Sequence, residues 1–300
     1  MNYLKYHIMK NLKFFIVALG MLSISSCSNS SEETELANNP ESTQMYSLGA
    51  KFVDQETYES FQKVDVNALT MKYLGKTATS ALATLPSSFT ITGSAIGDQG
   101  SEGSCVAWAT AYAATSALEY NFKGVTEPRS PEYVYNQIKI GSCSGGSYVS
   151  SGLDLIKNQG VCSWAEMPYT DVECSTQPNT TQQQAASTHT LTSWATVNKS
   201  DLTNIKTLLS MKLPIIIAVT VDQSFYNMGS TGWIWKSHSG KTYGGHAICV
   251  IGYDDAKQAF KVQNSWGSSW GSNGYFWIDY SFFAKTTKGA INECYVAYVQ

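Results

Sequence analysis

Hydrophobic positions give the first half of the chain a helical pattern and the part after about residue 195 an extended one. The run from Val106 to Tyr120 is rich in alanine, contains no glycine or proline, and stops near Gly124. A glycine just past the last helical residue is a common helix end. The pattern therefore predicts a helix that begins at or near Cys105, directly after the glycine-rich turn of residues 97–104.

Two shorter helices are expected further along the chain. Ser130 followed by Pro131 is typical of a helix start, because serine caps the first turn and proline fits its first position. Residues 152–159 form a second candidate, which ends before Gly160. We expect these segments to pack in the same helical half as the Cys105 helix.

The second half reads as strands. Residues 213–219 are a continuous apolar and largely β-branched run, which suits a buried strand. Further strands are expected over residues 245–253, 260–264, 275–278 and 295–299. The chain is therefore predicted to belong to the α+β class.

Cys105 is the first residue with candidate chemistry. The unpaired N–H groups and the dipole at a helix N-terminus favour negative charge, so a cysteine placed there has its thiolate stabilised. The thiolate is the nucleophilic form. The alternative is a small buried core cysteine, which is the commonest fate of a free cysteine.

Two distant segments favour the catalytic interpretation. They are Gly244-Gly245-His246 and Asn264-Ser265-Trp266-Gly267, the latter followed by Trp270-Gly271. With residues 97–109 they resemble the papain-like cysteine peptidases of family C1, in which Gln, Cys, His and Asn occur in this order. The cysteine-to-histidine separation is 246 − 105 = 141 residues, within the family's roughly 130–150. The resemblance runs from about Leu85 to the C-terminus and implies a helical half, a β-barrel-like half, and an active-site cleft between them.

The resemblance assigns a catalytic triad. Cys105 attacks the peptide carbonyl and forms an acyl-enzyme that water hydrolyses. His246 accepts the thiol proton and returns it to the leaving amine. Asn264 orients the imidazole through its amide oxygen.

Other roles are also implied by the resemblance. The side-chain amide of Gln99 and the backbone N–H of Cys105 form an oxyanion hole, where fixed donors stabilise the charge that develops on the carbonyl oxygen. Trp266 shields the histidine–asparagine contact from water, and Trp270 borders the leaving-group side. Ala218 lines the pocket for the second residue before the scissile bond. For both tryptophans, a place in the core is the alternative.

Gly145 and Gly146 are expected to bind substrate. In the family, this backbone pairs with an extended substrate as an added strand, and small residues allow the close approach. An ordinary glycine turn is the alternative. One departure lies nearby: many members have a cysteine three residues before the nucleophile, bonded to one before the glycine pair. This chain has Glu102 there, so Cys143 must pair elsewhere or stay free, and substrate preference near the cleft could change.

The seven cysteines leave several pairings open. Cys249, in an apolar run just after His246, is expected to be buried and reduced. A disulfide is expected within one set of three: Cys143, Cys162 and Cys174. A zinc site is the rival use of these cysteines, but paired Cys-x-x-Cys or Cys/His units are absent, so we expect no metal and no cofactor.

Residues 1–26 have the pattern of a targeting segment. Three lysines, Lys5, Lys10 and Lys13, precede an apolar run over residues 14–24, which is too short to cross a bilayer. The run ends in Ile24-Ser25-Ser26-Cys27, which resembles the bacterial lipobox. This implies an acylated Cys27 that anchors the protein to a lipid bilayer, outside the cytoplasm, on the bacterial outer membrane or cell surface. An ordinary secretory peptide is the alternative.

Three further regions follow from the pattern. Residues 27–50 are polar and are interpreted as a disordered tether. Residues 51–84 have loose helical spacing and are interpreted as a short propeptide or spacer, or else an N-terminal part of the domain. Residues 85–300 form the expected catalytic domain.

The charge composition argues against one class of function, nucleic-acid binding. The net charge of −3 lacks the basic footprint of a nucleic-acid binder. The expected protein is a monomeric, lipid-anchored cysteine endopeptidase that acts on peptides or proteins. A catalytically silent peptide- or glycan-binding lipoprotein of the same fold is the main alternative, and an acyl transferase is a weaker one.

Overall fold

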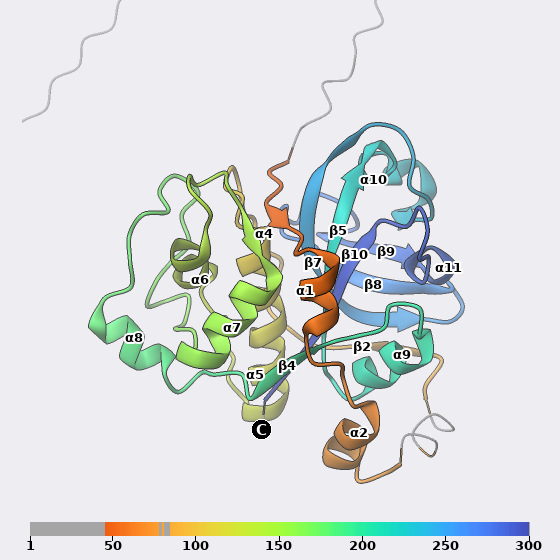
Figure 1. The fold of residues 1–300 in the computed structure, drawn as a ribbon, viewed down its shortest axis with the longest axis horizontal. Coiled ribbons are helices and arrows are strands. Elements are labelled where there is room, and N and C mark those ends of the chain that lie inside the picture. Colours follow the sequence, from red (N-terminus) through yellow and green to blue (C-terminus); the bar gives the residue numbers. More distant parts are fainter. Residues whose placement is uncertain (1–45, 78–79, 81–84, 300) are drawn as a thin grey trace, which may run out of the picture. The chain divides into compact units, whose positions relative to one another are not determined.

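The helix that carries Cys105 organises the helical half of the molecule (Figure 1). The computed structural model describes residues 46–77, 80 and 85–299. The helix runs from α4 (Cys105–Ala107) through a π-helical stretch (Trp108–Thr115) into α5 (Ser116–Lys123). It ends at Gly124, whose φ of 70° favours glycine. The predicted helix is confirmed, and α6 (Pro131–Ile138), α7 (Val149–Gln159) and α8 (Thr180–Ala186) complete this half.

Local sequence accounts for these helices. The hydroxyl of Ser130 accepts a hydrogen bond from the backbone of Tyr133, which confirms the predicted cap of α6. Helix α7 begins at Val149, three residues before the predicted start, and ends at Gly160 as expected. A disulfide joins Cys143 to Cys174, which is a pair within the predicted set, and Cys249 is buried and free as expected.

The second half is a mixed sheet with the strand order β4-β10-β5-β7-β8-β9-β6 and β2 paired to β7. Its pairings are antiparallel except β6 with β9. Across the described residues this order has two ends, so the sheet does not close into a barrel. The strands are β2 (Ser88–Thr90), β4 (Ser193–Thr196), β5 (Ile215–Asp222), β6 (Ile234–Trp235), β7 (Thr242–Asp254), β8 (Ala259–Gln263), β9 (Tyr275–Asp279) and β10 (Ile291–Tyr298).

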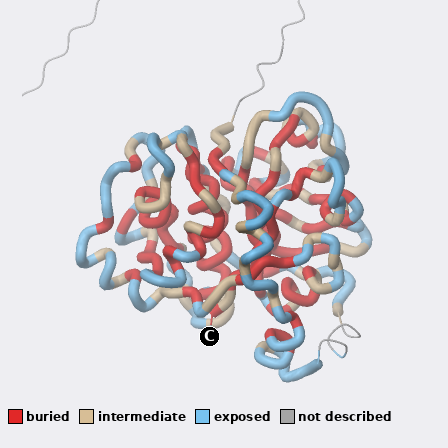
Figure 2. The backbone as a smooth tube through the Cα atoms, viewed as in Figure 1, coloured by how far each residue is buried: buried red, intermediate tan, exposed pale blue. Residues whose placement is uncertain are grey.

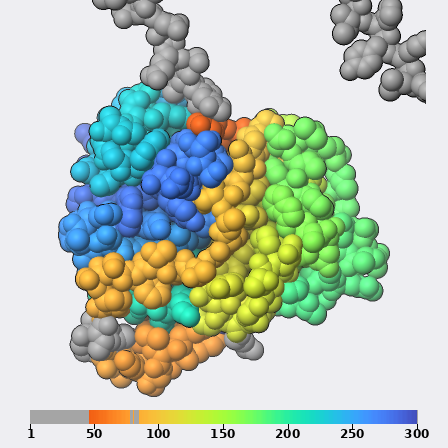
Figure 3. All heavy atoms as spheres, turned by 180° about the vertical axis from the view of Figure 1, so that it is seen from behind, coloured from red at the N-terminus to blue at the C-terminus, as the bar shows by residue number. Residues whose placement is uncertain are grey.

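Short helices flank the sheet. They are α9 (Leu202–Ser210), α10 (Gln223–Tyr226), a 3₁₀ turn (Met228–Thr231) and α11 (Tyr280–Phe283). Buried residues gather in the strands and in the helix that follows Cys105 (Figure 2). Seen from behind, the segment leading to Cys105 runs between the blue β half and the green helical half (Figure 3). Within the described residues, no helix is long and apolar enough to cross a bilayer.

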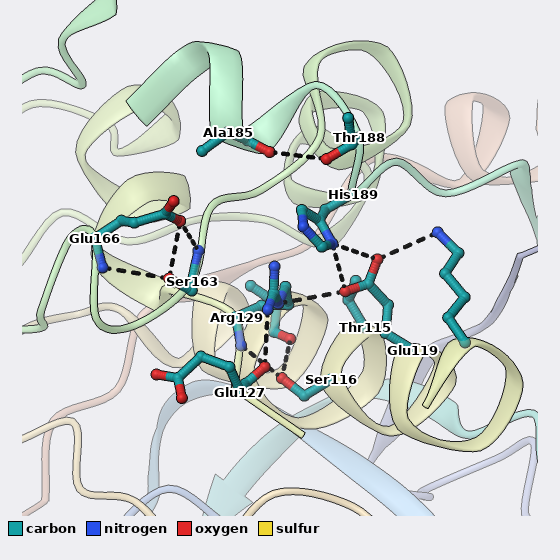
Figure 4. Close-up of polar contacts among 12 residues, drawn as sticks. Thr115, Ser116, Glu119, Glu127, Arg129, Ser163, Glu166, Ala185, Thr188 and His189 are labelled. Atoms are coloured by element: carbon teal, nitrogen blue, oxygen red, sulfur yellow. Dashed lines mark hydrogen bonds and ion pairs between the residues drawn. The ribbon is translucent and has the colours of Figure 1, made fainter. Parts of the chain in front are cut away.

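A buried charged cluster ties the helical half together (Figure 4). Glu119 on α5 is fully buried, and Arg129 Nε lies 3.3 Å from its carboxylate. Lys123 and His189 contact the same carboxylate, the histidine at 2.9 Å. Removing one partner of a buried pair typically costs about 3–5 kcal/mol, because the other charge stays buried and unpaired. His189 lies in a polar stretch of the sequence, yet its side chain is partly buried and joins this cluster.

The N-terminal residues differ most from expectation. Residues 46–50 were assigned to a disordered tether, but Gly49 and Ala50 are buried and β1 (Ala50–Lys51) pairs in parallel with β3 (Ser147–Tyr148). Helices α1 (Gln55–Ser60) and α2 (Val66–Leu74) follow. In Figure 1, α1 lies in front of the sheet, beside β10. The targeting segment and Cys27 lie outside the described residues.

Candidate active site

Cys105 opens helix α4 and faces the strand that carries His246. Its side chain is fully buried, and its thiol interacts with the backbone of Ala247, the residue after His246. Further backbone hydrogen bonds come from Val106, at the helix start, and from Gly49 and Ala50. Burial raises the pKa of the Cys105 thiol to about 11 despite these bonds. The thiol is therefore neutral at physiological pH in this state.

His246 and Asn264 are hydrogen-bonded partners on neighbouring parts of the sheet. The imidazole Nε2 lies 2.7 Å from Asn264 Oδ1, which also accepts from the backbone of Ser265 at 2.9 Å. The Trp266 ring stacks on the imidazole with a centroid distance of 4.6 Å, and all these residues are buried. Burial lowers the pKa of His246 to about 4, and the bond to Asn264 opposes this shift. Its Nδ1 has no hydrogen-bond partner among the described residues.

Ser265 holds Gln99 through two hydrogen bonds, and the side-chain amide of Gln99 donates two more. Its Oε1 accepts a hydrogen bond from Ser265 Oγ at 2.7 Å, and its backbone N–H donates to the Ser265 carbonyl at 2.8 Å. Its Nε2 donates to the Glu102 carbonyl at 3.0 Å and to the carbonyl of Ser47 at 3.1 Å. The amide predicted to stabilise an oxyanion therefore already binds a peptide carbonyl.

The Ser47 carbonyl belongs to residues 46–52, a segment of the same chain that we call the strap. Tyr46 stacks on Trp266 with the ring centroids 4.5 Å apart. Gly49 donates to the Gly245 carbonyl at 3.1 Å and accepts from the backbone of Ser147 at 2.8 Å. The strap therefore crosses the site from Trp266 to the loop before β3.

The contacts of the strap require glycine at several positions. A Cβ at Gly49 would lie 1.9 Å from the Gly103 carbonyl oxygen, and one at Gly146 would lie 1.9 Å from the Gly49 carbonyl oxygen. A Cβ at Gly145 would instead meet the Ile140 carbonyl oxygen at 1.7 Å. Of the glycine pair, Gly146 thus allows another backbone to approach, whereas Gly145 is needed for the turn of its own loop.

Trp270 and Ala218 are the remaining predicted residues. Trp270 is buried in an aromatic cluster and lies edge-on to Trp266, with the centroids 5.1 Å apart. Ala218 is fully buried within β5, opposite Ala247 of β7 and Glu293 of β10. The structure brings together Cys105, His246, Asn264, Gln99, Trp266 and Gly146 around the strap.

The sequence analysis missed the strap and the role of Ser265 in holding Gln99. One signal was present, because apolar residues alternate with Ser, Gly and Lys at Tyr46, Leu48, Ala50 and Phe52. Such alternation is typical of a strand. The polar composition of the preceding residues concealed it.

Comparisons with known proteins agree on the family. Residues 87–297 match the model of the family described as papain family cysteine protease. The chain is 30% identical over 202 residues to an uncharacterized peptidase C1-like protein of Acanthamoeba polyphaga mimivirus, covering 62% of this chain and 65% of that protein. It is 34% identical over 188 residues to gamete and mating-type specific protein A of Dictyostelium discoideum, covering 61% of this chain and 40% of that protein.

Solved structures show the same fold. Xylellain, a cysteine protease from Xylella fastidiosa, aligns with a TM-score of 0.69 and 22% identity over 85% of this chain and 96% of that one. At this identity the likeness establishes the fold alone, whereas the match to the family model covers more than half of the chain. The chain therefore belongs to the papain family of cysteine proteases.

Proposed function

We propose that this protein is a cysteine endopeptidase that is latent while its strap covers the site. The observation that carries the proposal is the capture of the Ser47 carbonyl by Gln99 Nε2, beside Cys105 and the His246–Asn264 pair. A site that holds one peptide carbonyl on its oxyanion donor is built to hold another. Polypeptide backbone is therefore the proposed substrate class.

The chemistry follows from the placement of the side chains. Once the strap leaves, a substrate carbonyl takes the place of the Ser47 carbonyl, and His246 Nδ1 takes the Cys105 proton. The thiolate attacks, the imidazolium protonates the leaving amine, and water then hydrolyses the acyl-enzyme. Asn264 keeps Nε2 of the imidazole fixed throughout, so that Nδ1 is the atom that exchanges the proton.

The strap keeps the site inactive for two physical reasons. It occupies the carbonyl position at Gln99, and it engages the thiol through Gly49 and Ala50. With the strap in place the cysteine and the histidine are both fully buried, and this burial shifts both pKa values toward the uncharged forms. A thiolate–imidazolium pair is therefore disfavoured until the strap opens.

The sequence left three interpretations of residues 51–84: a short propeptide, a spacer, or an N-terminal part of the domain. Contacts with the sheet favour the last, since the Val53 backbone donates to Glu293 Oε1 at 2.7 Å. The Tyr58 hydroxyl donates to the Cys294 carbonyl at 3.1 Å and accepts from the Cys294 backbone at 2.9 Å. These contacts fasten residues 53–58 to β10. We propose that residues 46–52 inhibit, and that residues 53–74 belong to the catalytic domain.

Hydrolysis of a denatured protein tests the proposal. The full chain should cleave casein slowly, and a Gly49→Ala variant should cleave it faster. Adding Cys105→Ala to that variant should abolish cleavage. Strong peptide binding without cleavage would instead support the catalytically silent alternative, and transfer of the acyl group to added amines would support a transferase.

We further propose that the protein is a lipid-anchored monomer outside the cytoplasm. The lipobox-like sequence before Cys27 supports the anchor, because acyl chains on one residue hold a protein at a bilayer without a spanning helix. Expressed in a bacterium, the parent should incorporate a labelled fatty acid and sediment with the outer membrane. A Cys27→Ala variant should do neither, and unchanged sedimentation of that variant would contradict the anchor.

A further inference from the structure

Glu102 is a buried carboxyl beside the nucleophile that the proposed mechanism does not use. It lies three residues before Cys105, and only 1% of its surface is exposed. Its Oε1 has no hydrogen-bond partner among the described residues, and its Oε2 lies 3.3 Å from the Tyr169 hydroxyl. In the described part of the chain it makes no ion pair. A buried carboxylate without a cation is costly, so the site favours the protonated acid.

The groups that face Glu102 reinforce this preference. Burial, and then the carboxylates of Glu132 on α6 and of Asp171 and Glu173 between α7 and α8, raise the pKa of Glu102 to about 7, whereas the Tyr169 hydroxyl opposes the shift. The other groups facing it from neighbouring elements are Tyr135 of α6 and the disulfide sulfurs of Cys143 and Cys174. Cys105, on α4, lies close to the same tyrosine.

Tyr169 connects Glu102 to the oxyanion loop. Its hydroxyl donates to the Gln99 carbonyl at 2.7 Å and lies 2.6 Å from Ser104 Oγ. A tyrosine hydroxyl carries a single proton. That proton can stabilise the Gln99 carbonyl or an ionised Glu102, but not both. The Glu102 backbone carbonyl also accepts from Gln99 Nε2, so the two residues are linked twice.

We propose that Glu102 is a proton-dependent positioning residue for the oxyanion hole. While its carboxyl is protonated, the Tyr169 hydroxyl stays on the Gln99 carbonyl and the loop holds Gln99 in place. When the carboxyl releases its proton to solvent, the carboxylate draws the tyrosine proton away from Gln99. It also places a negative charge near the sites of the thiolate and the oxyanion. The inference rests on the proposed function and adds to it an upper pH limit for activity.

The first test compares pH profiles in the full chain with the strap opened by Gly49→Ala. The ratio of kcat/KM for Glu102→Gln over the parent should be near one at pH 5.5. It should rise about fivefold or more by pH 8.5, because glutamine cannot ionise. Glu166→Gln, which removes a carboxyl in the same half that does not contact Tyr169, should leave the ratio flat. A flat ratio for Glu102→Gln would overturn the proposal.

A second comparison tests the route through Tyr169. In a Tyr169→Phe background, the pH-dependent gain from Glu102→Gln should fall by at least half, since the tyrosine proton is gone. An undiminished gain would show that Glu102 acts without the tyrosine and would overturn its positioning role.

A third measurement does not depend on turnover. In full chains that carry Cys105→Ala, the Tm of the Glu102 protein should fall relative to Glu102→Gln as pH rises from 4.5 to 8.5. A carboxyl whose folded pKa is raised stabilises the fold below its unfolded pKa and loses that contribution as pH rises through the folded one. Absence of turnover in every strap-opened variant would contradict the proposed function. A flat difference in Tm would contradict the inference itself.

Discussion

The carbonyl oxygen of Ser47 lies 3.1 Å from Nε2 of Gln99, the amide that we expect to stabilise an oxyanion. The contact joins two residues 52 positions apart and places the chain's own backbone where a substrate carbonyl would bind. Cys105 and His246 are fully buried in the same state. The proposed latency therefore rests on the contacts of this short strap with the site.

Gly49→Ala should open the strap. A Cβ there would lie 1.9 Å from the Gly103 carbonyl oxygen, which is backbone and cannot move aside cheaply. We expect alkylation of Cys105 by iodoacetamide at pH 7 to become at least tenfold faster, measured by peptide mapping. Lys51→Ala is the matched control, because the Lys51 side chain is exposed and its backbone pairing with Tyr148 would remain. Equal rates in both variants and the parent would show that the strap does not limit access.

The pH dependence of alkylation should differ between the covered and open states. Burial raises the pKa of Cys105 to about 11 and lowers that of His246 to about 4, so between these values both groups are neutral under the strap. Alkylation of the parent should therefore climb steadily toward pH 11 as the thiol ionises. The Gly49→Ala variant should show a plateau that begins near neutral pH, where an exposed imidazolium stabilises the thiolate. Identical profiles would contradict the coupling of burial to ionisation.

Gln99→Ala should reduce turnover in the Gly49→Ala background. Loss of one oxyanion donor costs about 2.7–4 kcal/mol, or about 10²–10³-fold in kcat, in comparable sites. Ser265→Ala removes only the hydroxyl that holds Gln99 Oε1, so its effect should be smaller. Steady-state kinetics on one fluorogenic peptide would rank the variants. A larger loss for Ser265→Ala than for Gln99→Ala would contradict the assigned roles.

The active form should keep residues 53–74. Beyond the contacts of Val53 and Tyr58 with β10, the Val64 backbone donates to the Thr196 carbonyl at 2.9 Å. The Tyr73 ring packs on Phe122 with the centroids 5.0 Å apart. N-terminal sequencing of the activated protein should place a cut before residue 53, with residues 53–74 still bound. An active protein that lacks residues 53–74 would contradict their place in the domain.

The residues of the candidate site could be found from sequence because each lies in a short motif with its own local pattern. The turn before Cys105, the glycine-flanked His246 and the tryptophans after Asn264 are visible in runs of a few residues. The helix after Cys105 and the strand around His246 follow from apolar periodicity over ten or more residues. The bond from His246 to Asn264 then follows from the pairing of β7 with β8.

The strap could not be predicted in the same way. Its contacts join Gly49 to Gly245 and Ser147, which are far apart in sequence, through backbone groups that carry no side-chain signature. The choice of Cys174 as the partner of Cys143 was also open, because pairing depends on tertiary distances that spacing does not reveal. The unpaired oxygen of Glu102 is likewise a property of the folded environment.

Labelling with a papain-family epoxide inhibitor tests the central claim most directly. Intact mass and peptide mapping would be recorded for the full chain, for Gly49→Ala, and for Gly49→Ala combined with Cys249→Ala. The Cys249→Ala change removes another buried free thiol, which lies on β7. We expect one adduct on Cys105 in both Gly49→Ala proteins, little in the parent within the same time, and none after His246→Ala. No adduct on Cys105 in any strap-opened protein, or equal labelling after His246→Ala, would contradict an activated cysteine held latent by the strap.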